Sequence, residues 1–477
     1  MSTGEEGKVI DCDVCVIGAG AGGLSVAVGA AQLGARTILF EKGAMGGDCL
    51  NYGCVPSKAL LAAARAARAI TEAQRFGIHA GEPQVDFAAV MAHVRGVIAQ
   101  IAPHDSVERL ESLGVRVICA AATFTGRDEV SGGGVRVHAR RIVLAAGSSA
   151  LIPAVPGIES VAPLTNETLF ALREQPAHLL VVGGGPVGVE MAQAFRRLGS
   201  AVTLIQRGRL LPRDEPELVA ALTARLTAEG IVVHEGAELT AVARLADAIA
   251  VRFTGERTAT GSHLLVATGR RPRLAGLGLE RADIAHNDFG VMVDARLRTT
   301  NRRVWALGDV IGRPQFTHTA GYQAGIVVRN ALFRLPAKVE YRALPWVTYC
   351  DPELAHVGLT EREARKRHGA SVQVVRVGLG DNDRARTERS ELGGLKVVID
   401  RRGIILGAGL LGPHAGELVG LWGLAITRRM KLSALNGVIF PYPTLGEVSK
   451  AAASAFYAPK LFSPWPRRLV RLLLSVT

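Results

Sequence analysis

Cys49 and Cys54 are the residues of this sequence best suited to chemistry. They lie in the segment GGDCLNYGCVPSK, residues 46–58, in which Gly53 relaxes the backbone between them. A zinc site would need further soft ligands at short spacing, and none is nearby. A reversible dithiol–disulfide pair is therefore the better interpretation. Lys58 follows Cys54 by four residues, on the same face if a helix begins there, and its charge can stabilise a thiolate.

A second set of residues is suited to holding a nucleotide. Residues 14–18 read VCVIG, a short strand pattern, and lead into Gly18, Gly20 and Gly23 of a G-x-G-x-x-G motif. Such glycines allow a tight turn and a close approach of the backbone to a pyrophosphate at the start of a helix. A second strand pattern, RTILFE, then ends at Glu41, whose carboxylate can accept hydrogen bonds from ribose hydroxyls. The spacing predicts a dinucleotide-binding fold.

The same pattern recurs near the middle of the chain. The strand pattern HLLVVG leads into a second motif, with glycines at Gly183, Gly185 and Gly188. The next strand pattern, AVTLIQ, ends at Gln206, where the first motif has an acid, and Arg207, Arg209 and Arg213 follow. Because no carboxylate repels a 2′-phosphate here, we expect NADPH to be preferred to NADH. The alternative is that these arginines only form a solvated loop.

Three more buried strand patterns end in small-residue turns. They cover residues 141–147, 263–269 and 302–309, and end at Gly147, Gly269 and Gly308-Asp309. An acid such as Asp309 at a strand end can accept a hydrogen bond from a ribityl or ribose hydroxyl, although it can also be an ordinary turn residue. The repetition favours a layout with two nucleotide sites.

Length and composition restrict the class of protein. The chain has 477 residues, enough for about three domains. Its net charge of +13 is scattered and aromatic residues make up only 5%, so nucleic-acid binding is not expected. Six cysteines are too few for a disulfide-stapled secreted scaffold, and the N-terminus MSTGEEGK has acids where a signal peptide needs basic residues. We therefore expect a cytoplasmic protein.

With these motifs in this order, the sequence resembles the flavoprotein disulfide reductases, the class I pyridine nucleotide-disulfide oxidoreductase family. Their hallmark, GGTCxNxGCxP[ST]K, matches residues 46–58 except that Asp48 replaces the threonine. The similarity covers nearly the whole chain and is closest in character to mercuric reductase-like members, with dihydrolipoyl dehydrogenase and glutathione reductase also similar. It implies an α/β fold class with two Rossmann-like dinucleotide-binding domains, for FAD and NAD(P), and a C-terminal α+β dimerisation domain.

The resemblance also implies domain boundaries. The FAD-binding domain is expected over residues 1–155 and 276–340, interrupted by the NAD(P)-binding domain over residues 156–275. The dimerisation domain is expected over residues 341–460, which implies a homodimer, and a basic amphipathic tail over residues 461–477.

The family implies a role for each site residue. Cys54 would face the flavin as the charge-transfer thiolate, and Cys49 would exchange with the substrate. Lys58 would lie near the flavin, paired with Glu190. The resemblance assigns FAD to Gly18, Gly20, Gly23, Glu41, Gly47, Lys58, Gly147, Gly308 and Asp309, and the pyridine nucleotide to Gly183, Gly185, Gly188, Arg207 and Gly269. Electrons would pass from NADPH through FAD to the cysteine pair.

The sequence departs from the disulfide-reducing members at a proton-transfer position. Those members carry a His-Pro-x-x-x-Glu dyad, whereas this chain has Tyr442 in place of the histidine and Glu447 at the acid. Histidine titrates near about 6.5 and tyrosine near about 10, so Tyr442 is a poor general base for dithiol oxidation. His414 is the nearest alternative base, although a surface-loop histidine is its plainer interpretation.

The tyrosine indicates what the final acceptor is. Mercuric reductases also carry it, which implies a thiophilic metal ion such as Hg(II), held transiently by Cys49 and Cys54, or another small acceptor. No structural metal is expected. Those enzymes use a C-terminal cysteine pair, but no cysteine follows Cys350 here. Two alternatives therefore stay open: dihydrolipoyl dehydrogenase or another disulfide reductase with an atypical base, and a membrane-recruited electron-transfer flavoprotein.

The tail from Trp465 reads WPRRLVRLLL, a short basic amphipathic stretch. It is too short to span a bilayer. It can make peripheral contact with an anionic membrane or pack on the partner subunit, and packing is the interpretation we favour.

The remaining cysteines look structural. Cys12 and Cys15 are expected in the core on opposite faces of the first strand, because side chains alternate along a strand. Cys119 and Cys350 are expected to be lone structural cysteines.

Overall fold

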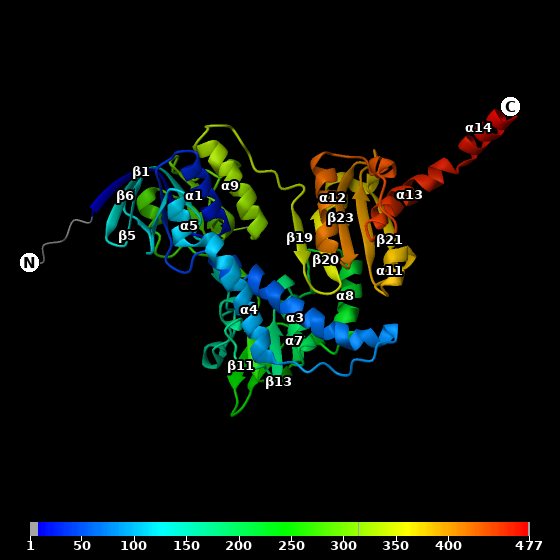
Figure 1. The fold of residues 1–477 in the computed structure, drawn as a ribbon, viewed down its shortest axis with the longest axis horizontal. Helices are drawn as coiled ribbons and strands as arrows, with labels where there is room; N and C mark the ends of the chain where they lie inside the picture. The colour runs from blue at the N-terminus through cyan, green and yellow to red at the C-terminus, as the bar shows by residue number, and fades with distance from the viewer. Residues whose placement is uncertain (1–7, 313, 476–477) are drawn as a thin grey trace, which may run out of the picture. The chain divides into compact units, whose positions relative to one another are not determined.

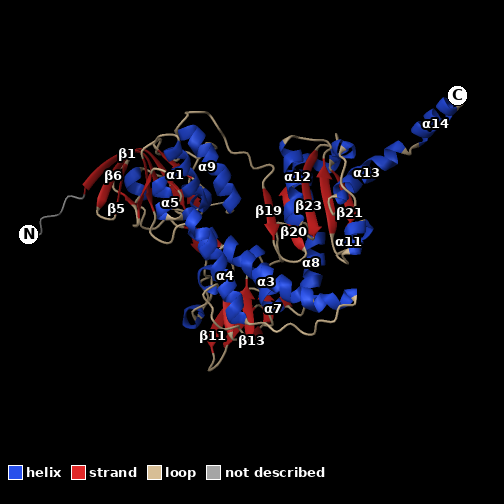
Figure 2. Ribbon diagram, viewed as in Figure 1, coloured by secondary structure: helices blue, strands red, loops and turns tan. Residues whose placement is uncertain are grey.

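The computed structural model is a mixed α/β fold that describes residues 8–312 and 314–475 (Figures 1 and 2). The chain divides into two compact units. Unit 1 comprises Met1–Ala177, Ala241–Ala250 and Gly261–Val339; unit 2 comprises His178–Thr240, Val251–Thr260 and Glu340–Thr477. The domain boundaries expected from the sequence stay predictions, since this division groups segments differently. Among the described residues, each helix is too short or too polar to cross a membrane.

Unit 1 is built on a seven-stranded sheet. Its strands are β1 (Lys8–Ile17), β2 (Thr37–Phe40), β3 (Val115–Ile118), β4 (Thr123–Phe124), β5 (Glu129–Gly132), β6 (Val135–Leu144) and β18 (Val304–Ala306). The order is β3-β2-β1-β6-β5-β4, and β18 also pairs with β6. The strands β3, β2, β1, β6 and β18 are parallel to one another, which is the arrangement of a dinucleotide-binding fold.

Short strands and helices complete unit 1. The strands are β7 (Ser148–Ala150), β14 (His263–Val266), β15 (Arg270–Pro272), β16 (His286–Asn287) and β17 (Gly290–Val291). The helices are α1 (Ala21–Gln32), α2 (Gly47–Asn51), α3 (Cys54–Glu72), α4 (Phe87–Ile101), α5 (Val107–Ser112), α6 (Asn166–Leu169) and α9 (Thr317–Ala331). Helix α1 packs against α9 and the sheet, so its N-terminus lies at the carboxyl end of β1, where a dinucleotide's phosphates bind.

The alternation of side chains along β1 breaks at Asp13. The prediction that Cys12 and Cys15 point to opposite faces is wrong, because both lie in one hydrophobic cluster with Ala139 and Ile142. The backbone N–H groups of Asp13 and the next residue both donate to the carbonyl of one residue, Arg36, at 2.9 and 3.2 Å. The core position of both cysteines is confirmed, and burial raises the pKa of each thiol, that of Cys12 to about 12.

Unit 2 contains two sheets. The first is parallel, with β8 (His178–Val182), β9 (Ala201–Ile205) and β10 (Val232–His234) in the order β10-β9-β8. The second is antiparallel, with β19 (Pro345–Thr348), β20 (Glu353–Gly358), β21 (Gln373–Gly378), β22 (Gly394–Ile399) and β23 (Ile405–Gly412) in the order β19-β20-β23-β22-β21. Three further strands, β11 (Leu239–Arg244), β12 (Ile249–Phe253) and β13 (Arg257–Gly261), lie where the chain passes between the units.

The helices of unit 2 are α7 (Pro186–Arg197), α8 (Pro216–Ala228), α10 (Glu361–His368), α11 (Asp383–Thr387), α12 (Ala415–Thr427), α13 (Glu447–Leu461) and α14 (Pro464–Leu474). Helix α12 packs on β19, β20 and β23, and α13 packs on β21 and β22. Their apolar faces form one core with the sheet, centred on the buried Trp422, Val397 and Leu410.

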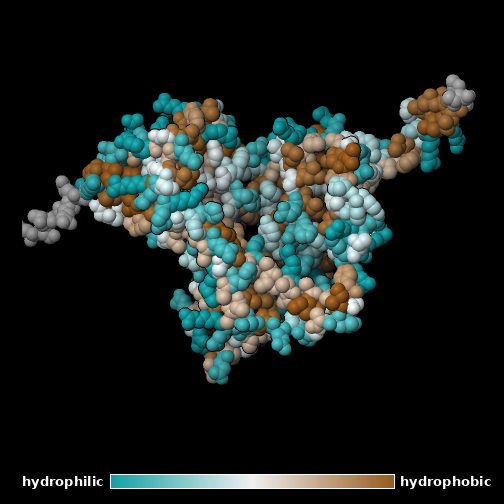
Figure 3. All heavy atoms as spheres, viewed as in Figure 1, coloured by the Kyte–Doolittle hydropathy of each residue, from teal (hydrophilic) through white to brown (hydrophobic). Residues whose placement is uncertain are grey.

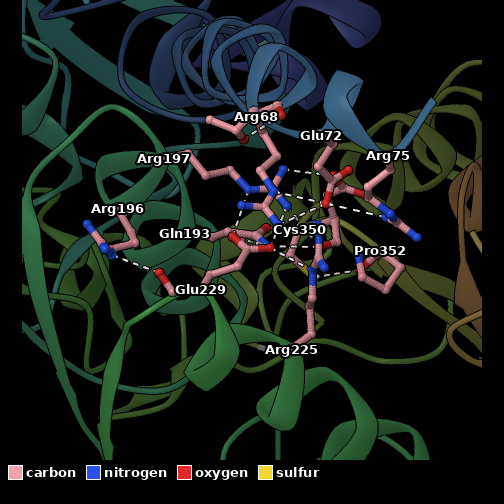
Figure 4. A network of polar contacts seen from close by, with 12 residues as sticks. Arg68, Glu72, Arg75, Gln193, Arg196, Arg197, Arg225, Glu229, Cys350 and Pro352 are labelled. Atoms are coloured by element: carbon pink, nitrogen blue, oxygen red, sulfur yellow. Dashed lines mark hydrogen bonds and ion pairs between the residues drawn. The ribbon is translucent and has the colours of Figure 1, made fainter. Parts of the chain in front are cut away.

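One face of α7 holds the loop between β19 and β20 (Figure 4). Arg197 is buried and pairs with Glu229 and with Asp351, both at 2.7 Å. Gln193 accepts a hydrogen bond from the Asp351 N–H at 2.7 Å and donates to its carbonyl at 2.8 Å. Such buried pairs are costly to break, because the remaining charge loses its partner in a dry environment. The loop is thereby fixed to α7.

Candidate active site

Cys49 and Cys54 lie at the junction of two helices. Cys49 is in α2, and Cys54 is the first residue of α3. Gly53 joins them, and a Cβ there would lie 2.9 Å from the carbonyl oxygen of Asp48 and 3.2 Å from the Cα of Cys49, so only glycine allows this close turn. Both cysteines are free thiols here; Cys49 is half-buried and Cys54 is exposed.

The surroundings of the two sulfurs differ. The N-terminus of a helix stabilises a thiolate, and Cys54 occupies that position in the 19-residue α3. Its Sγ also lies 3.4 Å from the hydroxyl of Thr317, at the start of α9. A hydrogen bond with Cys54 and burial raise the pKa of the Cys49 thiol far above its ordinary value. The geometry therefore favours a thiolate at Cys54 and a thiol at Cys49.

Lys58 lies one helical turn beyond Cys54. Because α3 begins at Cys54, the predicted shared helical face is confirmed. The Lys58 Nζ donates to the hydroxyl of Ser57 at 3.4 Å. Glu190 is buried on α7, where it accepts a hydrogen bond from the Tyr349 N–H at 2.9 Å. Lys58 and Glu190 belong to different units, and their pairing stays a prediction.

Asp48 joins the dithiol turn to two other segments of unit 1. Its Oδ1 lies 3.0 Å from an Nη of Arg270 on β15 and accepts a hydrogen bond from the Asn166 amide at 3.0 Å. The Nε of Arg270 donates to the Ser148 hydroxyl at 2.7 Å and lies 3.5 Å from the Asp309 carboxylate. Ser148 in turn donates to Asp309 at 2.6 Å. One guanidinium thus lies between the acid beside Cys49 and an acid expected to hold FAD.

The first glycine motif has the geometry of a phosphate cradle. A Cβ on Gly23 would lie 1.8 Å from the Gly18 carbonyl oxygen, so helix and strand approach as closely as glycine permits. A Cβ on Gly20, by contrast, would meet nothing within 4 Å, so there is open space in front of this residue. Glu41 accepts hydrogen bonds from the N–H of Ala19 at 2.6 Å and of Gly43 at 2.8 Å, which fixes the loops on both sides of the cradle.

Other residues expected to hold FAD gather around this cradle or end strands of the same unit. A Cβ on Gly47 would lie 2.7 Å from the Cα of Gly20, so the start of α2 rests on the glycine turn. Gly147 lies between β6 and β7, and Gly308 follows β18 and donates its N–H to Gln323 at 2.7 Å. Burial raises the pKa of the adjacent Asp309. These positions agree with a site that takes a dinucleotide along the carboxyl edge of the sheet.

The second glycine motif repeats the first in unit 2. Gly183 and Gly185 connect β8 to α7, and Gly188 lies in the first turn of α7, where a Cβ would lie 1.8 Å from the Gly183 carbonyl oxygen. Gln206 replaces the acid and accepts a hydrogen bond from the Gly184 N–H at 2.8 Å. Gly269, expected to contact the same nucleotide, precedes β15 in unit 1.

The three arginines after Gln206 have different surroundings. The Arg207 side chain is 79% exposed and lies 3.7 Å from Glu238. Arg209 donates to the Asp214 carbonyl at 3.3 Å, and Arg213 stacks over Trp346 with 5.0 Å to the ring centroid. Arg207 and Arg213 are both exposed and Arg209 is half-buried, and Arg213 differs from Arg207 in that its guanidinium stacks on an aromatic ring.

Tyr442 is hydrogen-bonded to an acid that belongs to none of the sequence motifs. Its hydroxyl donates to Oδ2 of Asp383, at the start of α11, at 3.1 Å. This carboxylate raises the pKa of Tyr442. Glu447 begins α13 and instead accepts a hydrogen bond from the Thr444 N–H at 3.2 Å. The hydroxyl of Tyr442 is thus held as a hydrogen-bond donor.

Comparison with known proteins identifies the family. Residues 12–324 match the family model described as pyridine nucleotide-disulphide oxidoreductase, and residues 344–453 match its dimerisation domain. The chain belongs to the pyridine nucleotide-disulphide oxidoreductase family. The resemblance inferred from the sequence is therefore confirmed, and so are the fold class and the assignment as an enzyme.

Individual relatives carry two different names. The chain is 39% identical to mercuric reductase of Streptomyces lividans over 455 residues, which cover 93% of this chain and 96% of that protein. It is 32% identical to dihydrolipoyl dehydrogenase of Geobacillus stearothermophilus over 456 residues, covering 93% and 96%. A solved structure, the HOCl-induced flavoprotein disulfide reductase RclA from Escherichia coli, has a TM-score of 0.84 at 28% identity and covers 93% of this chain and 99% of that one.

This pyridine nucleotide-disulphide oxidoreductase therefore uses FAD and a pyridine nucleotide, as its family does. The residues present fit both groups. The space in front of Gly20 at the start of α1 suits a pyrophosphate, and so does the corresponding space in front of Gly185 at the start of α7.

Three further single-residue predictions have different outcomes. Cys350 is buried, and its thiol donates to the Pro352 carbonyl at 3.1 Å, in agreement with a structural role (Figure 4). Cys119 is exposed, so the prediction of a structural cysteine is wrong there; the residue follows the last position of β3, where the strand leaves the sheet. His414 is exposed at the start of α12, as expected of a surface-loop histidine.

Proposed function

We propose that this oxidoreductase passes two electrons from NADPH to the Cys49–Cys54 pair and on to a thiophilic metal ion, Hg(II) in the first instance. The observation that carries the proposal is a pair of cysteines whose surroundings favour a thiolate at one and a thiol at the other. It is combined with Tyr442, rather than histidine, at the proton-transfer position. The 39% identity to a mercuric reductase supports the same acceptor class. Assembly as a homodimer through residues 344–453 is part of the proposal.

The cysteine roles follow from the local electrostatics. When bound, FAD takes a hydride from the pyridine nucleotide and supplies two electrons to the disulfide. Reduction of the disulfide with one proton leaves a thiolate and a thiol. The start of α3 and the Thr317 hydroxyl favour the thiolate at Cys54. The thiol is then at Cys49, which loses its proton when Hg(II) binds, because metals bind the thiolate form.

The tyrosine suits a metal better than a disulfide. Oxidation of a dithiol by a disulfide needs a base that takes a proton near neutral pH. The Tyr442 hydroxyl donates a hydrogen bond to Asp383, whose carboxylate raises the pKa of the phenol, so the phenol keeps its proton. Reduction of Hg(II) to Hg(0) consumes two electrons and no proton at the metal. The rate of such a reaction should therefore depend little on whether position 442 carries a histidine.

The preference for NADPH rests on the end of β9. Gln206 has no charge to repel a 2′-phosphate, and the exposed guanidinium of Arg207 is near enough in sequence to pair with one. A phosphate group is a stronger partner for Arg207 than the exposed Glu238 at 3.7 Å.

An acceptor screen tests the proposal. NADPH oxidation by the FAD-loaded protein is followed anaerobically with Hg(II) in excess thiol, oxidised glutathione, lipoamide and a quinone side by side. We expect Hg(II) to give the highest kcat/KM. A rate with lipoamide or oxidised glutathione above the rate with Hg(II) contradicts the proposal.

A second candidate is a disulfide reductase with an atypical base. The relative named dihydrolipoyl dehydrogenase, matched over 96% of its length, favours it. Its test is the reverse reaction, oxidation of dihydrolipoamide with NAD. Turnover there comparable with the NADPH–Hg(II) rate would favour this candidate over the first.

A further inference from the structure

The C-terminal helix α14 is amphipathic and exposed on all sides. It runs from Pro464 to Leu474, and none of its residues is buried. Figure 3 shows hydrophobic atoms gathered along this helix, with hydrophilic atoms on one side. The apolar side chains include Trp465, Leu472, Leu473 and Leu474, which are 60–71% exposed. A helix with such a face is normally covered by something apolar.

The arrangement of charge indicates what covers it. At 100° per residue, the arginines at positions 467, 468 and 471 share one narrow side of the helix, and the apolar residues occupy the rest. Residues 462–475 contain no acid. A broad apolar face flanked by cations, with tryptophan at one end, is the pattern of a helix that lies in the plane of an anionic membrane surface.

The length of α14 supports the same orientation. Eleven residues extend over about 16 Å, roughly half of the hydrocarbon thickness of a bilayer. The helix therefore cannot cross a membrane, but it can insert its apolar side at the interface. A helix this short is also marginal in water on its own, so an apolar surface would stabilise it.

A second copy of the chain, which the sequence alone led us to favour, is the other occupant to consider. The match to the family's dimerisation domain ends at residue 453, inside α13, and α14 begins eleven residues later. The matched dimerisation segment therefore does not include α14. Three arginines without any acid also complement lipid phosphates better than they complement this basic chain, which carries a net charge of +13.

We propose that α14 binds the enzyme to an anionic lipid surface. The apolar side enters the interface, and Arg467, Arg468 and Arg471 pair with lipid phosphates. This inference is independent of the identity of the electron acceptor.

Vesicle sedimentation tests it on the FAD-loaded full-length protein. Vesicles of phosphatidylcholine with one-third phosphatidylglycerol are compared with vesicles of phosphatidylcholine alone. We expect at least tenfold more protein bound to the anionic vesicles at low salt, falling as salt is raised. A chain ending at Ser463, and the variant L469S/L473S, should each lose this binding while NADPH turnover with a soluble acceptor is unchanged.

A charge-matched control separates α14 from the general basicity of the protein. R467Q/R468Q/R471Q should lose most of the binding, whereas R401Q/R402Q/R428Q removes the same charge from exposed positions elsewhere and should retain it. Equal binding of the full and shortened chains would overturn the proposal. So would conversion of a dimer to a monomer on shortening, measured by light scattering, because α14 would then bind the second copy.

Discussion

Arg270 lies 3.0 Å from Asp48, and the same guanidinium lies 3.5 Å from Asp309. All three side chains are 71–77% covered, with relative exposures of 23–29%, so solvent screens them less than it would a surface pair. Asp48 immediately precedes Cys49, at a position where the family's hallmark has a threonine. The charge beside the dithiol is therefore a property of this chain, and Arg270 balances it.

Replacing Asp48 should change the stability of the thiolate. In D48N the amide can still accept the Asn166 hydrogen bond, but the positive charge of Arg270 is no longer offset at this position. A positive charge favours a thiolate. We expect the long-wavelength absorption band of the two-electron-reduced, FAD-loaded enzyme to persist to lower pH, by on the order of one pH unit. R270M should shift the band in the opposite direction, and an unshifted band in both variants would contradict this.

The two cysteines should give different spectra when substituted. C54S removes the sulfur at the start of α3, so the long-wavelength band should disappear, whereas C49S should retain it. Both variants should lose measurable reduction of Hg(II), because each removes one sulfur of the pair. C119S is the matched control, since Cys119 is an exposed thiol outside the site and its loss should leave band and turnover unchanged. A band that survives in C54S contradicts the role proposed for Cys54.

Tyr442 allows a test of acceptor choice. Y442H introduces a group that titrates near about pH 6.5, so we expect turnover with dihydrolipoamide to rise by on the order of 100-fold. Y442F should retain Hg(II) reduction within about threefold, since no proton transfer is asked of the phenol. The readout is kcat/KM for both acceptors across pH 5.5–9. A Y442F enzyme that loses Hg(II) reduction while folding normally would show that the hydroxyl contributes directly.

Asp383 should control the titration of Tyr442. Its carboxylate raises the pKa of the phenol, so D383N should lower the pH at which Tyr442 ionises. The measurement is the tyrosinate absorbance difference between each protein and its Y442F counterpart. The same titration in wild type and D383N would mean that the 3.1 Å hydrogen bond does not persist in solution.

Arg207 should determine the nucleotide preference. R207A removes an exposed guanidinium and should raise KM for NADPH by about tenfold, with little change for NADH. R209A and R213A should leave the ratio of the two KM values unchanged, since Arg209 bonds a carbonyl and Arg213 stacks on Trp346. An equal loss with both nucleotides in R207A contradicts a role in 2′-phosphate binding.

Stability should depend on pH through Asp214. Its side chain is buried next to α8 and accepts the Trp346 indole N–H at 2.8 Å, and burial raises the pKa from 3.8 to about 6. The folded chain therefore binds more protons than the unfolded chain between these values, and the free energy of unfolding falls as pH rises through this window. D214N keeps an acceptor for Trp346 but cannot titrate. Its free energy of unfolding, relative to that of wild type, should therefore increase by up to about 3 kcal/mol as the pH rises through this window.

Chemical denaturation at pH 4, 5, 6 and 7 measures this difference. D288N, at an exposed aspartate, is the control and should show no trend relative to wild type. A pH-independent difference between D214N and wild type would mean that Asp214 titrates at its ordinary value.

Short-range features of the site could be predicted from sequence, and long-range partners could not. The start of α3 at Cys54 and the two glycine turns follow from residues that are neighbours in the chain. Thr317 is 263 residues from Cys54, and Asp383 is 59 residues from Tyr442. Neither Thr317 nor Asp383 belongs to a local sequence motif, because only tertiary packing brings each of them next to its partner. A threonine at the start of a helix, or an acid at the start of a short helix, is too common in sequences to indicate a functional site.

The prediction that side chains alternate along β1 was wrong for a similar reason, because tertiary packing changed the local backbone. It assumes an unbroken strand, but the backbone at Asp13 breaks the period, so Cys12 and Cys15 enter one cluster. Such a break depends on how the neighbouring strands twist and pair, which the sequence of β1 does not specify.

The bonds from α7 to the β19–β20 loop determine which parts of this enzyme can be exchanged with a relative. Glu190, Gln193 and Arg197 of α7 all bond residues 349–351, which lie in the dimerisation match, whereas α7 lies in the other family match. A chimera cut at the boundary between the two matches would separate the buried Arg197 from Asp351, one of its two carboxylate partners. Engineers who want a new nucleotide preference should therefore graft point changes at the end of β9, or transfer α7 together with its loop.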